Sequence, residues 1–472
     1  MNNLLRPPSP ALAGELAGAV RAIGAAMPLG SAHTRELPYA VRDLSRMLTL
    51  ERASLQTSYW INKRLLTAYC RYFLPWNLLR LSWLLPNLGL ALKPGDTVLD
   101  LGSGPLTLPL ALWAAFPAWR AMPLTFVCGD VAPAPLEAGR AIFRQLAGQS
   151  PWRIELRRGP LNKLLHTFSG KAALIGACNV LNELRPARDV SLEDRLGELA
   201  GLVASRLEPE GRFLAVEPGT RLGGRLMALL RRSAFAERLV PEAPCTHKGR
   251  CPMLEERANS WCHCTHNADA APAELVRLTR AAKLPKTGLS LSCLLLRPAT
   301  EAEWAGATAF VPAFADGDAD DMDDEAITRA SRAAWEGAFA AACDRDGGGR
   351  FVRILSDPIR LPGEGEAARY GCSHRGLVLV HNALRIPSGA ALEVSWPYRD
   401  ERDAKSGALV VAPSSAPRPA PAQAAPAQAA PVQAQPPAAR PRPARPPRPF
   451  ANHPRGGRPA KGRPAKPGPH TN

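Results

Sequence analysis

Four cysteines and three histidines lie close together between residues 241 and 266, in the run PEAPCTHKGRCPMLEERANSWCHCTH. Five residues separate Cys245 from Cys251, and Cys262 and Cys264 follow. Thiolates are soft ligands that suit zinc or an iron–sulfur cluster, and the intervening proline and glycine give a loop that can wrap around an ion. Structural zinc sites use closer pairs such as C-x(2–4)-C. The spacing therefore favours a metal site without deciding the metal.

Reduced thiols buried in a core are the alternative to a metal site. The start of the chain lacks the charged residues, apolar run and cleavage site of a signal peptide, so we expect a reducing compartment without disulfides. Zinc stays open as a ligand because three histidines accompany the cysteines: His247, His263 and His266. The remaining cysteines lie in apolar or helical contexts and are expected to be core thiols: Cys70, Cys128, Cys178, Cys293 and Cys343.

A glycine turn, DLGSGPLT, lies between a buried apolar run and a helical pattern at residues 100–107. A dinucleotide fingerprint needs a third glycine where Thr107 stands. An acidic residue directly before the glycines favours instead the cationic end of S-adenosylmethionine, and Asp130 is placed to accept hydrogen bonds from ribose hydroxyls. A glycine turn without any ligand is the alternative. The sequence predicts S-adenosylmethionine binding by Asp100, Gly102, Ser103, Gly104, Asp130 and Asn182.

Residues that would transfer a methyl group are harder to identify. The run NVLNELRP at 179–186 follows the fourth expected strand, where methyltransferases line the pocket near the reactive methyl. Asn182 and Glu183 are therefore candidates for orienting an acceptor, although a glutamate after a buried strand is as often a structural cap. The sequence has no Asn-Pro-Pro-Tyr motif for amino-group methylation.

Strand-like and helical runs alternate along the part of the chain that must position these groups. Such alternation predicts a doubly wound, mainly parallel α/β sheet, the Rossmann-like fold of class I S-adenosylmethionine methyltransferases. The cysteine run interrupts this pattern as an insertion would. The expected strands are 97–101, 124–130, 153–159, 173–179, 211–219 and 289–298.

Composition divides the chain into five regions. Residues 1–92 show helical spacing of apolar side chains, and 93–298 form the methyltransferase-like domain with the insertion at 241–266. Residues 299–346 are an acidic and helical linker, and 347–400 are expected to form a small β domain. Residues 401–472 are a Pro, Ala and Arg-rich tail that cannot bury enough apolar surface to fold.

The charge of the chain suits an anionic polymer. The formal net charge is +17, and residues 413–472 contribute ten Lys and Arg without any Asp or Glu. Clustered arginines at 221–239 extend this basic character toward phosphates. The most apolar run, 72–92, is interrupted by two prolines and Arg80, so no membrane span is expected.

The cysteine run APC-x-H-x-G-x-CP at 243–252, followed by WCH at 261–263, resembles the signature of a methyltransferase-like family. This family is associated with the small subunit of the mitochondrial ribosome and has bacterial relatives. Its other landmarks occur here in the same order: DLGSGP at 100–105, NVLNEL at 179–184 and EPGT at 217–220. The resemblance extends over about residues 30–398.

The resemblance implies a [4Fe–4S] cluster. Its matching ligands are Cys245, Cys251 and Cys262 in the insertion and Cys372 in the later β segment. A ligand so far downstream would fasten the β domain to the methyltransferase-like core. Cys264 stands where the family usually has an aromatic residue, so it either replaces Cys372 or is a bystander, and we favour the bystander.

The resemblance also implies a role in assembling the small ribosomal subunit through binding of its rRNA, and we expect a cytoplasmic monomer. Three hypotheses stay open. The first is an assembly protein with a methyltransferase fold and a cluster. The second is an active methyltransferase on RNA or protein. The third is a zinc-stabilised RNA-binding module with a vestigial cofactor pocket.

Overall fold

The computed structural model describes residues 3–49, 60–184, 190–255, 260–284, 286–308, 337, 348–361 and 367–414. The expected core thiol Cys343 and the tail from residue 415 lie outside the described residues, as does most of the linker. The account below concerns the described residues only.

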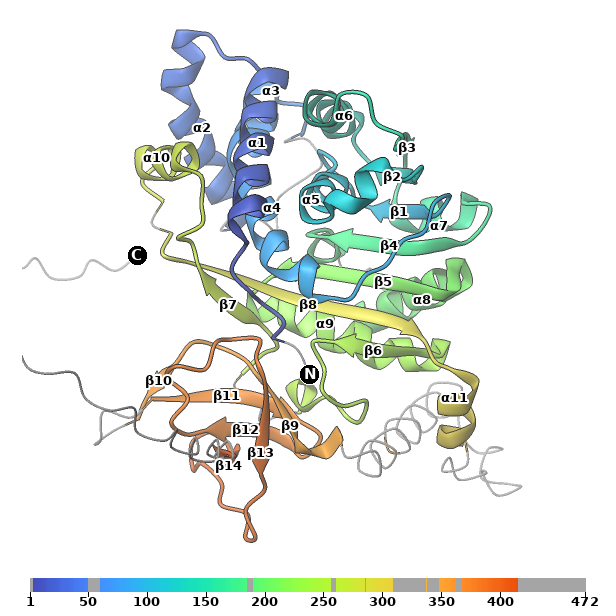
Figure 1. Cartoon of the computed structure of the whole chain (residues 1–472), viewed down its shortest axis with the longest axis vertical. Helices are drawn as coiled ribbons and strands as arrows, with labels where there is room; N and C mark the ends of the chain where they lie inside the picture. Colours follow the sequence, from blue (N-terminus) through green and yellow to red (C-terminus); the bar gives the residue numbers. More distant parts are fainter. Residues whose placement is uncertain are drawn as a thin grey trace, which may run out of the picture. The chain divides into compact units, whose positions relative to one another are not determined.

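The larger sheet has the strand order β3-β2-β1-β4-β5-β8-β6, with β7 paired to β8 (Figure 1). β1 to β5 are mutually parallel, and β8 runs antiparallel to β5, β6 and β7. This arrangement confirms the predicted Rossmann-like α/β fold. Its strands are β1 (Thr97–Leu101), β2 (Thr125–Asp130), β3 (Arg153–Arg158), β4 (Ala172–Cys178), β5 (Leu207–Pro218), β6 (Leu239–Ala243), β7 (Cys264–Asn267) and β8 (Gly288–Pro298).

Helices cover both faces of this sheet, so its central strands are buried on both sides, whereas the edge strand β3 has no fully buried residue. Alternate side chains of β1 enter opposite hydrophobic layers: Val98 joins one, and Leu99 and Leu101 join the other. The first layer contains α5 (Thr107–Ala115) and α6 (Pro133–Ala147). The second contains α7 (Leu161–Thr167), α8 (Leu192–Arg206) and α9 (Arg221–Ala234).

The region before the sheet is helical, as predicted. The first helix begins where the Ser9 hydroxyl accepts a hydrogen bond from Leu12 N at 3.2 Å. It contacts α4, α5 and α6, which places the N-terminal helices over the first layer (Figure 1). The elements are α1 (Pro10–Ala26), α2 (Ser31–Thr49), α3 (Lys63–Ala68), a π-helical turn (Tyr69–Phe73) and α4 (Leu74–Leu84).

Shorter elements complete the first domain. α10 (Ala273–Ala281) follows β7, and α11 (Glu301–Thr308) follows β8. Short 3-10 turns lie at Leu85–Asn87, Pro117–Ala121, Leu181–Glu183, Phe235–Glu237, Pro252–Leu254 and Gly348–Arg350.

The C-terminal strands close into a small barrel. β9 pairs with both β11 and β13, which joins the two ends of the sheet. Its interior is formed mainly by aliphatic side chains: Val352, Ile354, Val378, Val380, Val394, Leu409 and Val411. The strands are β9 (Phe351–Ile354), β10 (Ile359–Arg360), β11 (Ala367–Ser373), β12 (Gly376–Val380), β13 (Ala391–Ser395) and β14 (Leu409–Pro413).

The end of the barrel differs from the expected boundary of the tail. β14 lies within the range 401–472 that composition assigned to the tail. The short apolar run at 408–412 pairs with β12 and β13 and buries Leu409. A few apolar residues thus suffice for a strand when two neighbours already present their edges.

Gly139 on α6 allows this helix to pack closely against the glycine turn. A Cβ at this position would lie 2.4 Å from the backbone carbon of Pro105. We expect Gly139→Ala to lower the free energy of unfolding by about 1–3 kcal/mol through overpacking. Urea unfolding followed by circular dichroism measures this change.

The matched control is Gly197 on α8, where a Cβ would meet nothing within 4 Å. Gly197→Ala is expected to stabilise the protein by about 0.5–1 kcal/mol, since alanine loses less backbone entropy in a helix. Equal effects of the two substitutions would contradict the close packing at Gly139.

Candidate functional site

The glycine turn after β1 is held to the end of β2. Gly102 and Gly104 have φ angles of 64° and 51°, in the left-handed region that favours glycine. Ser103 N donates to Gly129 O at 2.9 Å, and Gly104 N donates to Asp130 Oδ2 at 3.0 Å. A Cβ on Gly104 would meet no atom within 4 Å. The space beside Gly104 is therefore open, whereas a Cβ on Gly102 would lie 2.3 Å from Val180 Cγ2, so Gly102 is needed for close packing.

A pocket of about 390 Å³ lies beside this turn, at the carboxyl ends of the parallel strands. Gly102, Asp130 and Glu183 are among the residues that line it. Its apolar wall suits the flat face of a nucleobase, and the Asp130 carboxylate suits hydroxyl groups. The apolar wall consists of Val131, Pro160, Leu161, Val180, Leu184, Val190, Leu199 and Leu202.

Asp100 lies beneath the glycine turn rather than on the pocket wall. Its side chain is 1 % exposed and accepts a hydrogen bond from the Ser103 hydroxyl. Burial raises the pKa of Asp100 to about 7, the Ser103 hydrogen bond opposes this shift, and the Asp130 charge adds to it. The structure thus places Asp100 and Ser103 in support of the turn, while Gly102 and Asp130 line the pocket.

The two catalytic candidates have different surroundings. Glu183 lines the pocket, whereas the Asn182 side-chain amide donates to the carboxylate of Glu217. Glu217 also accepts from Leu181 N at 2.7 Å and is fully buried at the end of β5. Sequence reasoning used the EPGT run only as a landmark and missed this role of its glutamate. The signal that could have identified Glu217 is that an acidic residue stands at the end of a buried strand.

Tyr69 in the N-terminal helical region is a further residue that the sequence did not indicate. Burial raises the pKa of the Tyr69 phenol, and the charges of Glu183, Cys70 and Asp130 raise this pKa further. Tyr69 does not line the pocket itself, although the charges of two carboxylates that do line it, Glu183 and Asp130, act on its phenol. Asn77 Nδ2 donates to its oxygen at 3.5 Å. Helical spacing alone could not distinguish Tyr69 from an ordinary core residue.

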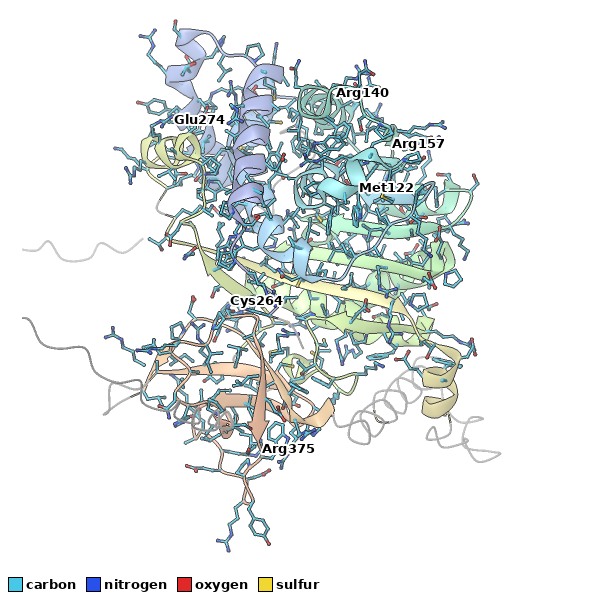
Figure 2. All side chains as sticks on the ribbon, in the orientation of Figure 1. Met122, Arg140, Arg157, Cys264, Glu274 and Arg375 are labelled. Atoms are coloured by element: carbon cyan, nitrogen blue, oxygen red, sulfur yellow. The ribbon has the colours of Figure 1, made fainter. Side chains whose placement is uncertain are left out.

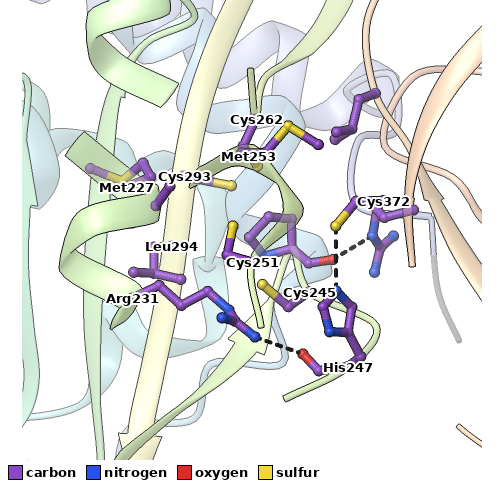
Figure 3. A pocket seen from close by; sticks show the side chains of 14 residues that line it. Met227, Arg231, Cys245, His247, Cys251, Met253, Cys262, Cys293, Leu294 and Cys372 are labelled. Carbon is purple, nitrogen blue, oxygen red and sulfur yellow. Dashed lines mark hydrogen bonds between the residues drawn. The ribbon is translucent and has the colours of Figure 1, made fainter. Parts of the chain in front are cut away.

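A second pocket lies where the cysteine insertion meets the barrel (Figure 3). All four predicted ligands line it: Cys245, Cys251 and Cys262 come from the insertion, and Cys372 comes from β11. Its cavity volume is about 20 Å³, enough for about one water molecule. Within the described ranges, no group of three or more His, Cys, Asp or Glu side chains is arranged to hold a metal ion.

The structure changes the grouping of the other cysteines. Cys293 on β8, expected to be an ordinary core thiol, lines the same pocket. Cys264 is buried on β7 and does not line it. Figure 2 marks Cys264 close to the barrel. The position of Cys293 is fixed by the pairing of β8 with β5 and β6. The spacing of residues in the sequence does not reveal this pairing, so sequence reasoning missed Cys293.

The histidines of the insertion are also separated by the structure. His247 lines the thiol pocket, and its Nε2 lies 3.4 Å from Cys372 Sγ (Figure 3). His263 and His266 lie outside this lining, and their ring Nδ1 atoms are 2.9 Å and 2.8 Å from Trp261 O and Asn267 O. Only one histidine therefore accompanies the thiols.

Two buried arginines border the thiols. Arg231, on the helix expected to present arginines to phosphates, is 2 % exposed. Its Nη2 donates to His247 O at 3.3 Å and also to Gly249 O, whereas Nε and Nη1 have no hydrogen-bond partner. Arg353 Nε donates to Pro244 O at 2.6 Å. The thiol pocket thus contains fixed positive charge.

The charges of these groups depend on one another. Burial lowers the pKa of Arg231, but Cys245, Cys251 and Cys372 in their thiolate form raise it more, so its pKa is raised overall. Burial raises the pKa of Cys372 first, and the neighbouring Cys251 and Cys245 raise this pKa further. The charges of Arg231 and Arg353 oppose this shift, but the pKa of Cys372 stays well above that of a free thiol, so Cys372 keeps its proton at neutral pH.

Comparison with protein families supports the resemblance seen in the motifs. Residues 92–284 match the family model described as mitochondrial small ribosomal subunit Rsm22. This range includes the glycine turn and the three predicted cluster ligands of the insertion and ends before Cys372. The match confirms the resemblance to the methyltransferase-like family of the small ribosomal subunit. A search of curated proteins found no match.

The comparison with solved structures finds methyltransferases at low identity. A methyltransferase from Pyrococcus furiosus is 14% identical, with a TM-score of 0.25, and the match covers 32% of this chain and 68% of that one. Geranyl diphosphate C-methyltransferase from Streptomyces coelicolor is 11% identical, with a TM-score of 0.28 and coverages of 46% and 78%. TrmN from Thermus thermophilus is 17% identical, with a TM-score of 0.26 and coverages of 50% and 48%.

None of the helices in the described ranges combines the length and apolar character needed to cross a lipid bilayer. The apolar run at 72–92 instead packs as α4 and its neighbouring turns.

Asp100 makes the stability of the protein depend on pH. Its pKa rises from 3.8 to about 7 on folding, so its neutral form is favoured in the native state. The stabilisation is complete below about pH 4 and is lost as the pH rises through about 7. We expect Asp100→Asn to flatten the pH dependence of the unfolding free energy over this range and to stabilise the protein above pH 7. Urea unfolding at a series of pH values measures this.

Glu137→Gln is the control for the lost charge, because Glu137 is exposed on α6 and pairs with Arg140 at 2.5 Å. It should leave the pH profile unchanged. A profile of Asp100→Asn that coincides with that of the natural protein would contradict the buried state of Asp100.

Proposed function

Starting from the match of residues 92–284 to the small-subunit family, we propose that this protein is an S-adenosylmethionine-binding, methyltransferase-like factor. It acts in small ribosomal subunit assembly and translation by binding rRNA, as a monomer in the cytoplasm. The observation that carries the cofactor assignment is the open glycine turn beside the pocket containing Asp130.

The residues of the first pocket fit S-adenosylmethionine. The Asp130 carboxylate accepts hydrogen bonds from Gly104 N in the turn, at 3.0 Å, and from Ala132 N, at 2.9 Å. Its remaining lone pairs can accept hydrogen bonds from ribose hydroxyls. The apolar wall accommodates adenine, and the left-handed glycines let the ligand approach the backbone. When bound, the cofactor supplies an electrophilic methyl group. Asp100 and Ser103 keep the turn in place from below.

The residues of the second pocket fit a [4Fe–4S] cluster by their chemistry. Four cysteine thiols are the ligand set of such clusters, and Cys245, Cys251, Cys262 and Cys372 line one space. A cluster bound by four thiolates would carry negative charge, which the buried Arg231 would balance. Because the cavity volume is about 20 Å³, the side chains must move apart to admit the cluster. Zinc bound by the same thiols is the alternative.

The cluster would have a structural role in this protein. Three ligands belong to the insertion and the fourth belongs to the barrel, so a bound cluster would join the two. Its binding free energy would then contribute to folding.

Methyl transfer is the second candidate function. Glu183 lines the pocket and can orient an acceptor or hold a proton there. Transfer of labelled methyl groups to small-subunit rRNA, abolished by Asp130→Ala, would support an active enzyme. A bound cofactor without transfer would leave the assembly role.

We expect Asp130→Asn to weaken S-adenosylmethionine binding by about tenfold or more, because hydrogen bonds to a charged acceptor are worth about 1.5–3 kcal/mol. Isothermal titration calorimetry at fixed pH measures the affinity. Glu210→Gln is the control, since Glu210 is exposed and pairs with Lys93 at 2.9 Å. Equal affinities of the Asp130→Asn variant and the natural protein would refute the ribose role.

We expect protein purified without oxygen to contain iron and acid-labile sulfide, and Cys372→Ser to lose most of both. Metal and sulfide analysis with absorption spectroscopy measures the content. Cys264→Ser is the matched control, because this buried thiol lies outside the pocket lining and should leave the iron content unchanged. Iron-free natural protein would exclude the cluster, and zinc in its place would favour the alternative.

A further inference from the structure

The strand order of the barrel identifies its fold type. β12 and β14 are parallel, with Val378 opposite Leu409 and Val380 opposite Val411, and the other neighbours are antiparallel. β9 and β10 both pair with β11 and act as one interrupted first strand. The order is then 1-2-3-5-4, closing on strand 1, which is the five-stranded Greek-key barrel of the OB-fold. Such barrels bind oligonucleotides or oligosaccharides on strands 2 and 3 and on the loops 1–2 and 4–5.

The surface of strands 2 and 3 is already occupied by the chain itself. Ala368, Leu377 and Leu379 form an apolar cluster against which Met253 of the insertion packs. Cys372 on the same face lines the thiol pocket. This leaves the rim of the barrel, formed by the loop between β13 and β14 and by the turn between β11 and β12, for an outside partner.

The rim carries an aromatic side chain with no packing role. Tyr398, in the loop between β13 and β14, is 101 % exposed. Trp396 nearby is held in place: the Arg375 guanidinium carbon lies 5.0 Å from its ring centroid, and the His374 ring lies 5.4 Å away, edge-on. Figure 2 marks Arg375 on the barrel. A fully exposed tyrosine offers a free π-face on which a base can stack.

A groove of about 600 Å³ runs beside this loop. Arg375, Arg402 and Lys405 line it, against one carboxylate, Glu255 of the insertion. Asp400 contacts both guanidinium groups, at 2.8 Å from Arg375 and 3.6 Å from Arg402, and so orients them. The excess of cations on the groove wall suits phosphate groups.

Two further acidic groups lie in the loop: Glu401 is exposed, and Asp403 stabilises a turn. Asp403 Oδ2 accepts from Ser406 N at 2.7 Å and from Ser406 Oγ at 2.6 Å. These hydrogen bonds occupy one oxygen of its carboxylate and hold the bend that contains Lys405.

We propose that this rim is a binding site for single-stranded RNA, an inference that rests on and deepens the proposed rRNA binding. A base stacks on Tyr398, and the adjoining phosphates enter the groove lined by Arg375, Arg402 and Lys405. The cations favour RNA over an uncharged oligosaccharide. The lone exposed ring favours unpaired bases, because duplex RNA does not present its base faces.

The test uses the full chain and a fluorescent oligouridine of about ten nucleotides, a length within the site size of one OB-fold. Fluorescence anisotropy measures the affinity. Tyr398→Ala should weaken binding by about tenfold, and Tyr398→Trp should restore it. Lys405→Gln should weaken RNA binding. It should also make the affinity less sensitive to salt concentration, by the amount expected for the loss of about one phosphate contact.

The matched control is Tyr39→Ala on α2. Tyr39 is 59 % exposed and has the Arg42 guanidinium carbon 5.1 Å from its ring centroid, so it is a similar aromatic and basic pair elsewhere. It should leave the affinity unchanged. The basic tail is present in every variant and contributes equally to all measurements.

Three outcomes would overturn the proposal: an affinity unaffected by Tyr398→Ala, an equal loss with Tyr39→Ala, or duplex RNA bound as tightly as the single strand. If any of these occurred while S-adenosylmethionine and iron were still bound, the rim site would be wrong and the cofactor assignments would stand. If the Tyr398 variant loses RNA binding while the natural protein binds neither S-adenosylmethionine nor iron, the rim site is supported and the two cofactor assignments are refuted.

Discussion

The buried guanidinium group of Arg353 joins three segments that are far apart in the chain. It donates from Nε to Pro244 O in the insertion and from Nη1 to Gly389 O in the barrel, both at 2.6 Å. Gly389 O also accepts from Leu4 N at 2.9 Å. Burying a charged group is costly unless it is hydrogen-bonded, so these bonds favour one arrangement of the segments. The thiol pocket, which Arg353 and Pro244 line, lies at this junction, and its shape depends on it.

One continuous stretch of chain connects the two pockets. Glu217 at the end of β5 holds Asn182 and the turn beside the first pocket. α9 begins directly afterwards, where the Thr220 hydroxyl accepts from Gly223 N at 3.1 Å. The same helix then carries Arg231 to the thiol pocket. Since the stretch is strand, cap and helix without a flexible loop, the positions of the two pockets are fixed relative to each other by regular backbone geometry.

Sequence reasoning succeeded where a pattern is local. Apolar runs bounded by glycine and proline located the parallel strands, and the glycine turn with Asp130 located one pocket, because parallel strands end at the same edge. It failed where tertiary pairing decides. Cys293 enters the thiol pocket and Cys264 does not, which follows from the pairing of β7 and β8 rather than from spacing. β14 forms because two neighbouring strands offer their edges.

The position of β8 between β5 and β6 has a consequence for biosynthesis. β8 follows both of its neighbours in the chain, with the cysteine insertion and α10 between. While the polypeptide emerges from N- to C-terminus, one edge of β5 and the whole of β6 stay without a partner until residue 298 has been made. Unpaired edges of this kind invite pairing with other nascent chains. Truncated translation products that end within the insertion would therefore be prone to aggregation. Chaperones that shield unpaired β edges would act during this interval of synthesis.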